Sequence, residues 1–117
     1  MRKIYHLSTC NTCKRIIKDL RNGEGFTMQD IKTEKITPAQ LDAMKDLAGS
    51  YENLFTRRSR QWSARGLKDK TLTEQDYRDL ILEEYTFLKR PVVIIEDEIF
   101  IGNAGKTVTA AKKAAGI

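Results

Sequence analysis

Two cysteines with two residues between them stand where a strand pattern gives way to a helix pattern, and no other feature restricts the fold more. Lys3 to Leu7 is a short apolar run that predicts a strand, and Cys10 and Cys13 follow a polar turn. Residues 14–22 then carry apolar side chains at helical spacing and end at Asn-Gly. Residues 26–31 alternate apolar and polar side chains, as a second strand does. The order strand–helix–strand predicts a βαβ unit with a parallel strand pair.

The middle of the chain, residues 37–86, has a helical pattern instead. Thr37 is placed to cap a helix, proline occupies the first helical position, and Gln40 can complete a capping box. A second helix start lies at Thr73. We therefore expect a helical insertion after the βαβ unit.

The last third returns to strands. Residues 92–95 are a β-branched run typical of a buried strand, and residues 99–101 predict the partner of an antiparallel hairpin. Residues 102–115 are rich in alanine and lysine and predict a closing helix. The predicted fold class is α/β with a mixed sheet, and we expect residues 1–117 to form one domain.

Composition argues against a membrane-spanning or secreted protein and is consistent with a soluble globular one. The chain has 117 residues, 40% of them hydrophobic and 32% charged, and a net charge of +5, which is typical of a soluble globular protein. No apolar run is long enough to span a bilayer, and the first residues do not resemble a signal peptide. We expect a cytoplasmic protein with no membrane partner.

The chemistry is expected at the cysteine pair. A helix N-terminus has unpaired N–H groups and partial positive charge, so it lowers the pKa of a thiol placed there. Cys10 is thus the predicted nucleophile, and Cys13, one helical turn further, the resolving thiol. Two alternatives stay open. The pair could be inert and buried, or half of a zinc site, although His6 is the only histidine and no third cysteine exists.

The neighbouring charges also bear on Cys10. His6 ends the first predicted strand and is either structural or a cation that favours the Cys10 thiolate. Lys14 and Arg15 begin the helix and add positive potential next to the motif.

Two separate motifs resemble the glutaredoxin-linked arsenate reductase and Spx family. The first is Ile4-Tyr5-His6 followed by Cys10-Asn11-Thr12-Cys13-Lys14, and the second is Leu88-Lys89-Arg90-Pro91-Val92-Val93. The resemblance implies a thioredoxin-like fold in which residues 37–86 are the helical insertion.

The resemblance also implies roles for individual residues. Cys10 matches the nucleophile, His6 a histidine that precedes it, and Arg90 an arginine that contacts the oxyanion in arsenate reductases. Pro91 matches a proline that is usually cis and lies beside the active cysteine. We expect Pro91 to contact the substrate, and the remaining substrate contacts to come from Asn11, Thr12, Lys14, Arg57 and Arg58. No metal or bound cofactor is expected, and glutathione, thioredoxin or glutaredoxin is the implied reductant.

Three functions follow from this resemblance. Arsenate reductases use three arginines, of which this chain matches Arg90, with Thr56 at the first position and no arginine near Ile101. This pattern favours a thiol–disulfide oxidoreductase over a glutathione-dependent arsenate reductase. The cysteine pair also resembles Spx, a redox-sensing transcriptional regulator that binds the RNA polymerase α subunit.

Residues 57–70 form the most basic stretch of the chain. It is either a solvated helical face or a positive rim that accepts glutathione carboxylates, an oxyanion or an acidic partner surface. Direct nucleic-acid binding is not favoured, because no binding motif and no aromatic residue other than Trp62 accompanies the charges.

Overall fold

A computed structural model describes residues 1–117, which divide into two compact units. The first unit joins Met1–Lys35 to Arg90–Ile117, and the second is Ile36–Lys89. The second unit corresponds closely to the helical insertion predicted for residues 37–86. None of the helices combines the length and apolar character that a membrane span requires.

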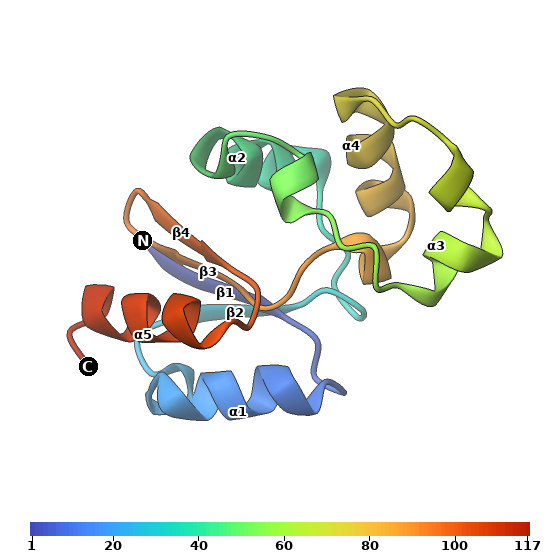
Figure 1. The fold of residues 1–117 in the computed structure, drawn as a ribbon. Coiled ribbons are helices and arrows are strands. Elements are labelled where there is room, and N and C mark those ends of the chain that lie inside the picture. The colour runs from blue at the N-terminus through green and yellow to red at the C-terminus, as the bar shows by residue number, and fades with distance from the viewer. The chain divides into compact units, whose positions relative to one another are not determined.

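A four-stranded mixed sheet organises the first unit (Figure 1). Its strands are β1 (Arg2–His6), β2 (Thr27–Asp30), β3 (Val92–Ile95) and β4 (Glu98–Ile101), in the order β2-β1-β3-β4. Strand β1 pairs in parallel with β2 and antiparallel with β3, and β3 pairs antiparallel with β4. The predicted parallel pair and the predicted hairpin are both confirmed.

Two helices, α1 (Asn11–Asp19) and α5 (Gly105–Ala114), cover the same face of this sheet (Figure 1). Their apolar sides pack on the strands in a buried cluster of Ile4, Ile16, Leu20, Val93, Ile95 and Ala111. Burying each large aliphatic side chain contributes about 1.5–3 kcal/mol, so this layer holds the helices in place. Helix α1 ends earlier than predicted, because Arg21, Asn22 and Gly23 all adopt positive φ angles in a 3₁₀ turn.

The second unit contains three α-helices separated by short 3₁₀ turns. The α-helices are α2 (Pro38–Ala48), α3 (Arg60–Ala64) and α4 (Glu74–Glu83). The 3₁₀ turns are η2 (Glu52–Leu54), η3 (Leu67–Asp69) and η4 (Tyr85–Phe87). The capping box predicted at the start of α2 is confirmed: the Gln40 N–H donates to Thr37 Oγ1 at 3.1 Å and the Thr37 N–H donates to Gln40 Oε1 at 3.1 Å. Thr73 and Asp76 form the same motif at the start of α4.

Side-chain contacts tie the elements of the second unit together. Phe55 stacks on Phe87 and meets Tyr77 edge-on, each at a centroid distance of 4.9 Å. On another side, Arg78 of α4 donates to both carboxylate oxygens of Asp42 on α2, at 2.8 and 3.2 Å. The unit therefore has its own packed core and its own polar links.

Candidate active site

Cys10 occupies the N-cap position of α1, directly after the turn that leaves β1. Its N–H donates to the Leu7 carbonyl at 3.0 Å, and its own carbonyl accepts from the Lys14 N–H at 3.0 Å. These two bonds fix the turn and the first helical residue. No side chain caps α1, so its first N–H groups remain available to a sulfur atom at this position.

Several opposing influences set the pKa of the Cys10 thiol, and their net effect lowers it. Partial burial acts to raise this pKa. Hydrogen bonds from the Cys13 backbone N–H, the Cys13 thiol and the Thr12 backbone N–H outweigh burial, and the positive charge of Arg90 adds to them. The thiolate is therefore favoured at Cys10 for the reason that the sequence suggested, a helix N-terminus directed at the sulfur.

The environment of Cys13 has the opposite effect to that of Cys10, because it raises the pKa of the thiol. Its side chain is fully buried, and burial is the main cause that raises the pKa of its thiol to about 11. The neighbouring Cys10 raises it further, both as hydrogen-bond acceptor and as a negative charge. Both thiols are free. The pair thus combines a partly exposed thiol with a lowered pKa and a buried thiol with a raised pKa.

Arg90 and Pro91 come to this site through the pairing of β1 with β3. The antiparallel register places Tyr5 opposite Val92, so the residues just before β3 lie beside the end of β1. The Arg90–Pro91 peptide bond is cis, as the resemblance implied. Arg90 is half-buried with its Nε atom fully enclosed, and its charge lowers the pKa of both cysteines.

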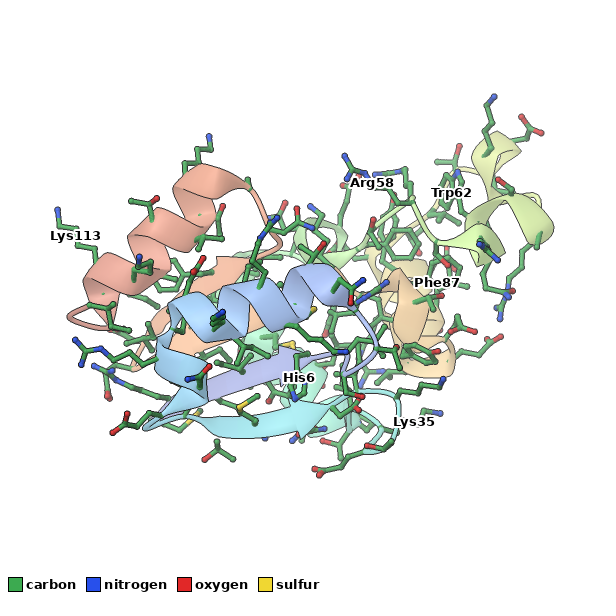
Figure 2. The ribbon with its side chains drawn as sticks, turned by 90° about the horizontal axis from the view of Figure 1, so that it is seen from below. His6, Lys35, Arg58, Trp62, Phe87 and Lys113 are labelled. Atoms are coloured by element: carbon green, nitrogen blue, oxygen red, sulfur yellow. The ribbon has the colours of Figure 1, made fainter.

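His6 ends β1 and lies opposite Asp30, the last residue of β2 (Figure 2). Hydrogen bonds from Ser8 hold the pKa of the Asp30 carboxyl below its usual value, and the charge of His6 contributes to the same shift. The cation that acts on the Cys10 pKa is Arg90. His6 interacts instead with the carboxylate at the neighbouring strand end.

The remaining predicted contacts of the first unit lie on the first turn of α1. Asn11 and Lys14 are exposed, whereas Thr12 is half-buried and acts on Cys10 through its backbone N–H. No three His, Cys, Asp or Glu side chains come together in a group that could hold a metal ion.

Arg57 and Arg58 belong to the second unit and differ sharply from each other. Arg57 donates to Glu52 at 3.1 Å and to the Tyr77 hydroxyl at 2.9 Å, and its guanidinium lies over the Trp62 ring at 5.4 Å. Arg58 is exposed, and its side chain forms no ion pair. Arg57 therefore supports the packing of its own unit, while Arg58 has its charge available.

A protein-family model described as the ArsC family matches residues 5–111. This match includes both cysteines, Arg90 and Pro91, and covers most of the chain. The chain belongs to the ArsC family. No curated protein sequence matches it.

Solved structures agree with this assignment at the level of the fold. An ArsC family related protein from Bacteroides fragilis is 23% identical with a TM-score of 0.80, over 95% of this chain and 97% of the other. An arsenate reductase from Vibrio cholerae is 17% identical with a TM-score of 0.74, over 97% of this chain and 96% of the other. The ArsC-family chain thus has the thioredoxin-like fold that the resemblance implied.

The structure of this ArsC-family chain also shows interactions that its sequence did not suggest. Asp30 was not among the predicted site residues, because the strand register places it opposite His6 and within reach of Ser8. Thr12 was expected only as a substrate contact, and the structure shows in addition that its backbone N–H helps to lower the Cys10 pKa. A search for carboxylates at strand ends would have identified Asp30 as a candidate.

Proposed function

We propose that this protein is a thiol–disulfide oxidoreductase with Cys10 as its nucleophile. One observation carries the proposal: Cys10 has a lowered pKa at the uncapped start of α1, next to a buried Cys13 with a raised pKa. An accessible thiolate beside a protonated thiol is the arrangement that a dithiol mechanism requires.

In the first step the Cys10 thiolate attacks one sulfur of a substrate disulfide. A bond forms between Cys10 Sγ and that sulfur, the substrate S–S bond breaks, and the other half of the substrate leaves as a thiolate. Arg90, whose charge lowers the pKa of Cys10, also suits an anionic substrate that approaches this end of the sheet.

In the second step Cys13 resolves the mixed disulfide. The negative charge on Cys10 disappears when its sulfur enters a disulfide, and with it one cause of the raised Cys13 pKa. Cys13 then loses its proton more easily and attacks Cys10 Sγ. The second half of the substrate leaves as a thiolate, and an intramolecular disulfide remains, so the substrate has gained two electrons.

A reductant must return the protein to its dithiol form. Two molecules of glutathione, or one dithiol of a thioredoxin or glutaredoxin, supply the two electrons and become oxidised to a disulfide. The enzyme itself is unchanged at the end of this cycle, and no bound cofactor takes part.

Arsenate is a second candidate substrate, which the name of the Vibrio cholerae neighbour and the charge of Arg90 beside Cys10 favour. Cys10 would form a sulfur–arsenic bond with loss of water. A second thiol would then attack Cys10 Sγ and arsenite would leave with the electron pair of the S–As bond, after which a third thiol would reduce the resulting mixed disulfide and return Cys10 to its thiol form. Thr56 stands at one of the three arginine positions expected for such a site and no arginine lies near Ile101, which favours a disulfide substrate.

The test is turnover of a glutathione mixed disulfide, measured by NADPH consumption with glutathione and glutathione reductase. The same assay is run with arsenate as substrate. Cys10→Ser should abolish turnover, and Cys13→Ser should weaken it, because external glutathione can still resolve the adduct. Arsenate-dependent consumption that exceeds disulfide turnover would reassign the substrate.

Equal activity of both variants and the wild type would reject the oxidoreductase proposal. If such a result came with binding of the RNA polymerase α subunit that changed with the redox state of Cys10 and Cys13, the Spx-like regulatory function would replace it.

A further inference from the structure

Charge is distributed unevenly within the second unit. Residues 57–70 contain six basic residues and one acidic residue, Asp69, whereas residues 71–84 contain five acidic residues and one basic residue, Arg78. The two stretches adjoin in the fold as well, because one groove of about 300 Å³ is lined by Lys70 from the first and by Asp76 and Asp79 from the second. The unit therefore presents a basic surface next to an acidic one.

The carboxylates of the unit neutralise only part of the basic stretch. Arg57 pairs with Glu52 at 3.1 Å, and Arg65 pairs with Glu83. The other four cations are exposed and form no ion pair, although carboxylates are plentiful in the same unit; they are Arg58, Arg60, Lys68 and Lys70. The fold leaves a net positive charge on this surface.

Trp62 lies near Arg58 (Figure 2), stands between Arg60 and Lys68 in the sequence, and is partly buried. Its ring meets Phe55 edge-on at a centroid distance of 5.9 Å, and the Arg57 guanidinium covers it at 5.4 Å. The helix that carries Trp62 is anchored as well, because Ser59 caps α3 and shares a 2.6 Å hydrogen bond with Thr86. A held tryptophan loses little conformational entropy when a partner covers it.

We propose that Arg58, Arg60, Trp62, Lys68 and Lys70, which we term the α3–η3 surface, form a docking site for an acidic protein surface. Tryptophan and arginine are the residues that most often dominate protein interfaces. Four cations without ion pairs complement a cluster of carboxylates on the partner, which steers the encounter and fixes the orientation. The site goes beyond the thiol chemistry of Cys10 and does not depend on it.

The groove at the border of the surface adds an apolar contact. Leu67, Leu72 and Leu80 line it together with Lys70. Its two carboxylates already have partners within the chain, since Asp76 accepts from the Thr73 N–H and Asp79 accepts from Gln75. Both carboxylates keep their negative charge, so the groove offers a partner its leucine side chains. The partner's own carboxylates face Arg58, Arg60 and Lys68 instead.

The adjoining acidic stretch argues against a nucleic acid as the partner. A nucleic-acid backbone is an extended polyanion that needs a continuous basic track. Here a track that continued past Lys70 would meet the exposed side chains of Glu74, Asp79 and Glu83. An acidic patch of limited size on a protein avoids this repulsion.

Trp62 is the single tryptophan of the chain, so its fluorescence reports directly on the α3–η3 surface. The probe is a 16-residue peptide of glutamate, aspartate and leucine, titrated at low salt while Trp62 emission is followed. The quadruple variant Arg58→Gln, Arg60→Gln, Lys68→Gln, Lys70→Gln should weaken binding about tenfold or more and suppress the emission change. Thermal unfolding of each variant checks that it is folded.

The matched control removes the same charge from the first unit, with Lys18→Gln, Lys35→Gln, Lys106→Gln and Lys113→Gln, all of them exposed. This control should change the affinity less than about twofold and keep the Trp62 signal. Equal weakening in both variants would show attraction by net charge alone and would overturn the proposal.

Two other occupants are outcomes of the same experiment. Tighter binding of a 16-nucleotide single-stranded DNA than of the peptide would replace the protein partner with a nucleic acid. Self-association at low salt, measured by sedimentation velocity and lost in the quadruple variant, would show that the acidic stretch of a second copy occupies the surface. Either result would overturn the proposal.

Discussion

Helix α1 of the first unit and helices α2 and α4 of the second begin in opposite ways. Thr37 and Thr73 each start their helix with a complete capping box, so side chains satisfy the first N–H groups. Helix α1 starts at Cys10 with no side-chain cap, and its N–H groups act on a sulfur atom. The contrast shows that α1 begins without the stabilising side-chain cap of α2 and α4, at the position where the proposed nucleophile lies.

Giving α1 the cap that it lacks is the change with the largest expected effect. Serine at position 10 is a good N-cap residue, and Cys10 already has the extended backbone angles of a cap, φ −92° and ψ 114°. Cys10→Ser should stabilise the fold by about 0.5–1 kcal/mol. It should also reduce disulfide turnover by at least about a hundredfold, because a hydroxyl is a far weaker nucleophile than a thiolate.

Urea denaturation and the turnover assay measure the two effects of Cys10→Ser on one preparation. A loss of activity without a gain in stability would mean that the sulfur already satisfies the helix N-terminus. The contrast between α1 and the capped helices would then fail.

The next largest expected effect is the pH dependence of the free energy of unfolding that the buried Cys13 thiol causes. The Cys13 pKa is raised from 9.0 to about 11, so the folded state holds this proton more tightly than the unfolded chain does. The resulting stability is complete below about pH 9 and is lost as the pH rises toward 11. The wild type should therefore lose about 2–3 kcal/mol more stability than Cys13→Ser between pH 8 and pH 11.

Urea unfolding of both proteins across this pH range tests the prediction. Subtracting the curve of Cys13→Ser removes the contributions of tyrosines and lysines that titrate in the same range. Parallel curves for the two proteins would mean that Cys13 is solvated in the folded state.

Removing a cap from the second unit should cost stability without affecting the thiols. Thr37→Ala and Thr73→Ala each remove the side-chain oxygen that accepts from a backbone N–H, Gln40 in one case and Asp76 in the other. Each variant should lose about 1 kcal/mol of unfolding free energy. The rate of Cys10 alkylation at pH 7 should stay within experimental error of the wild type, and a changed rate would contradict the separation of the two roles.

The smallest predicted effect concerns Arg90. Its charge is the weakest of the influences that lower the Cys10 pKa, behind the hydrogen bonds of Cys13 and Thr12. Arg90→Gln should therefore slow Cys10 alkylation at pH 7 only about twofold to fivefold. Alkylation rates against pH, with mass spectrometry to identify the modified cysteine, measure the shift. A larger effect than this would move the main cause of the low pKa from the helix to the arginine.

Local patterns explain why much of the fold was predictable. The capping box at Thr37 and Gln40 depends on residues three apart, and the hairpin formed by β3 and β4 depends on two runs separated by Glu96 and Asp97. Both interactions are complete within a few residues, so the sequence contains everything that they need. The end of α1 was less predictable, because the left-handed angles already begin at Arg21, before the Asn22-Gly23 stop signal that the sequence shows.

The candidate site also has features that follow from the local sequence and features that depend on the tertiary structure. The sequence by itself determined that Cys10 and Cys13 stand at the start of a helix, because a strand pattern, a turn and a helical pattern follow one another directly. The tertiary structure decided that Cys13 is fully buried and that Arg90 acts on both thiols. The register of β1 against β3 brings Arg90 to Cys10 from the far end of the chain, and packing of α1 on the sheet removes Cys13 from water. Burial and long-range charge depend on these non-local contacts, and the pKa difference between the two thiols arises from them.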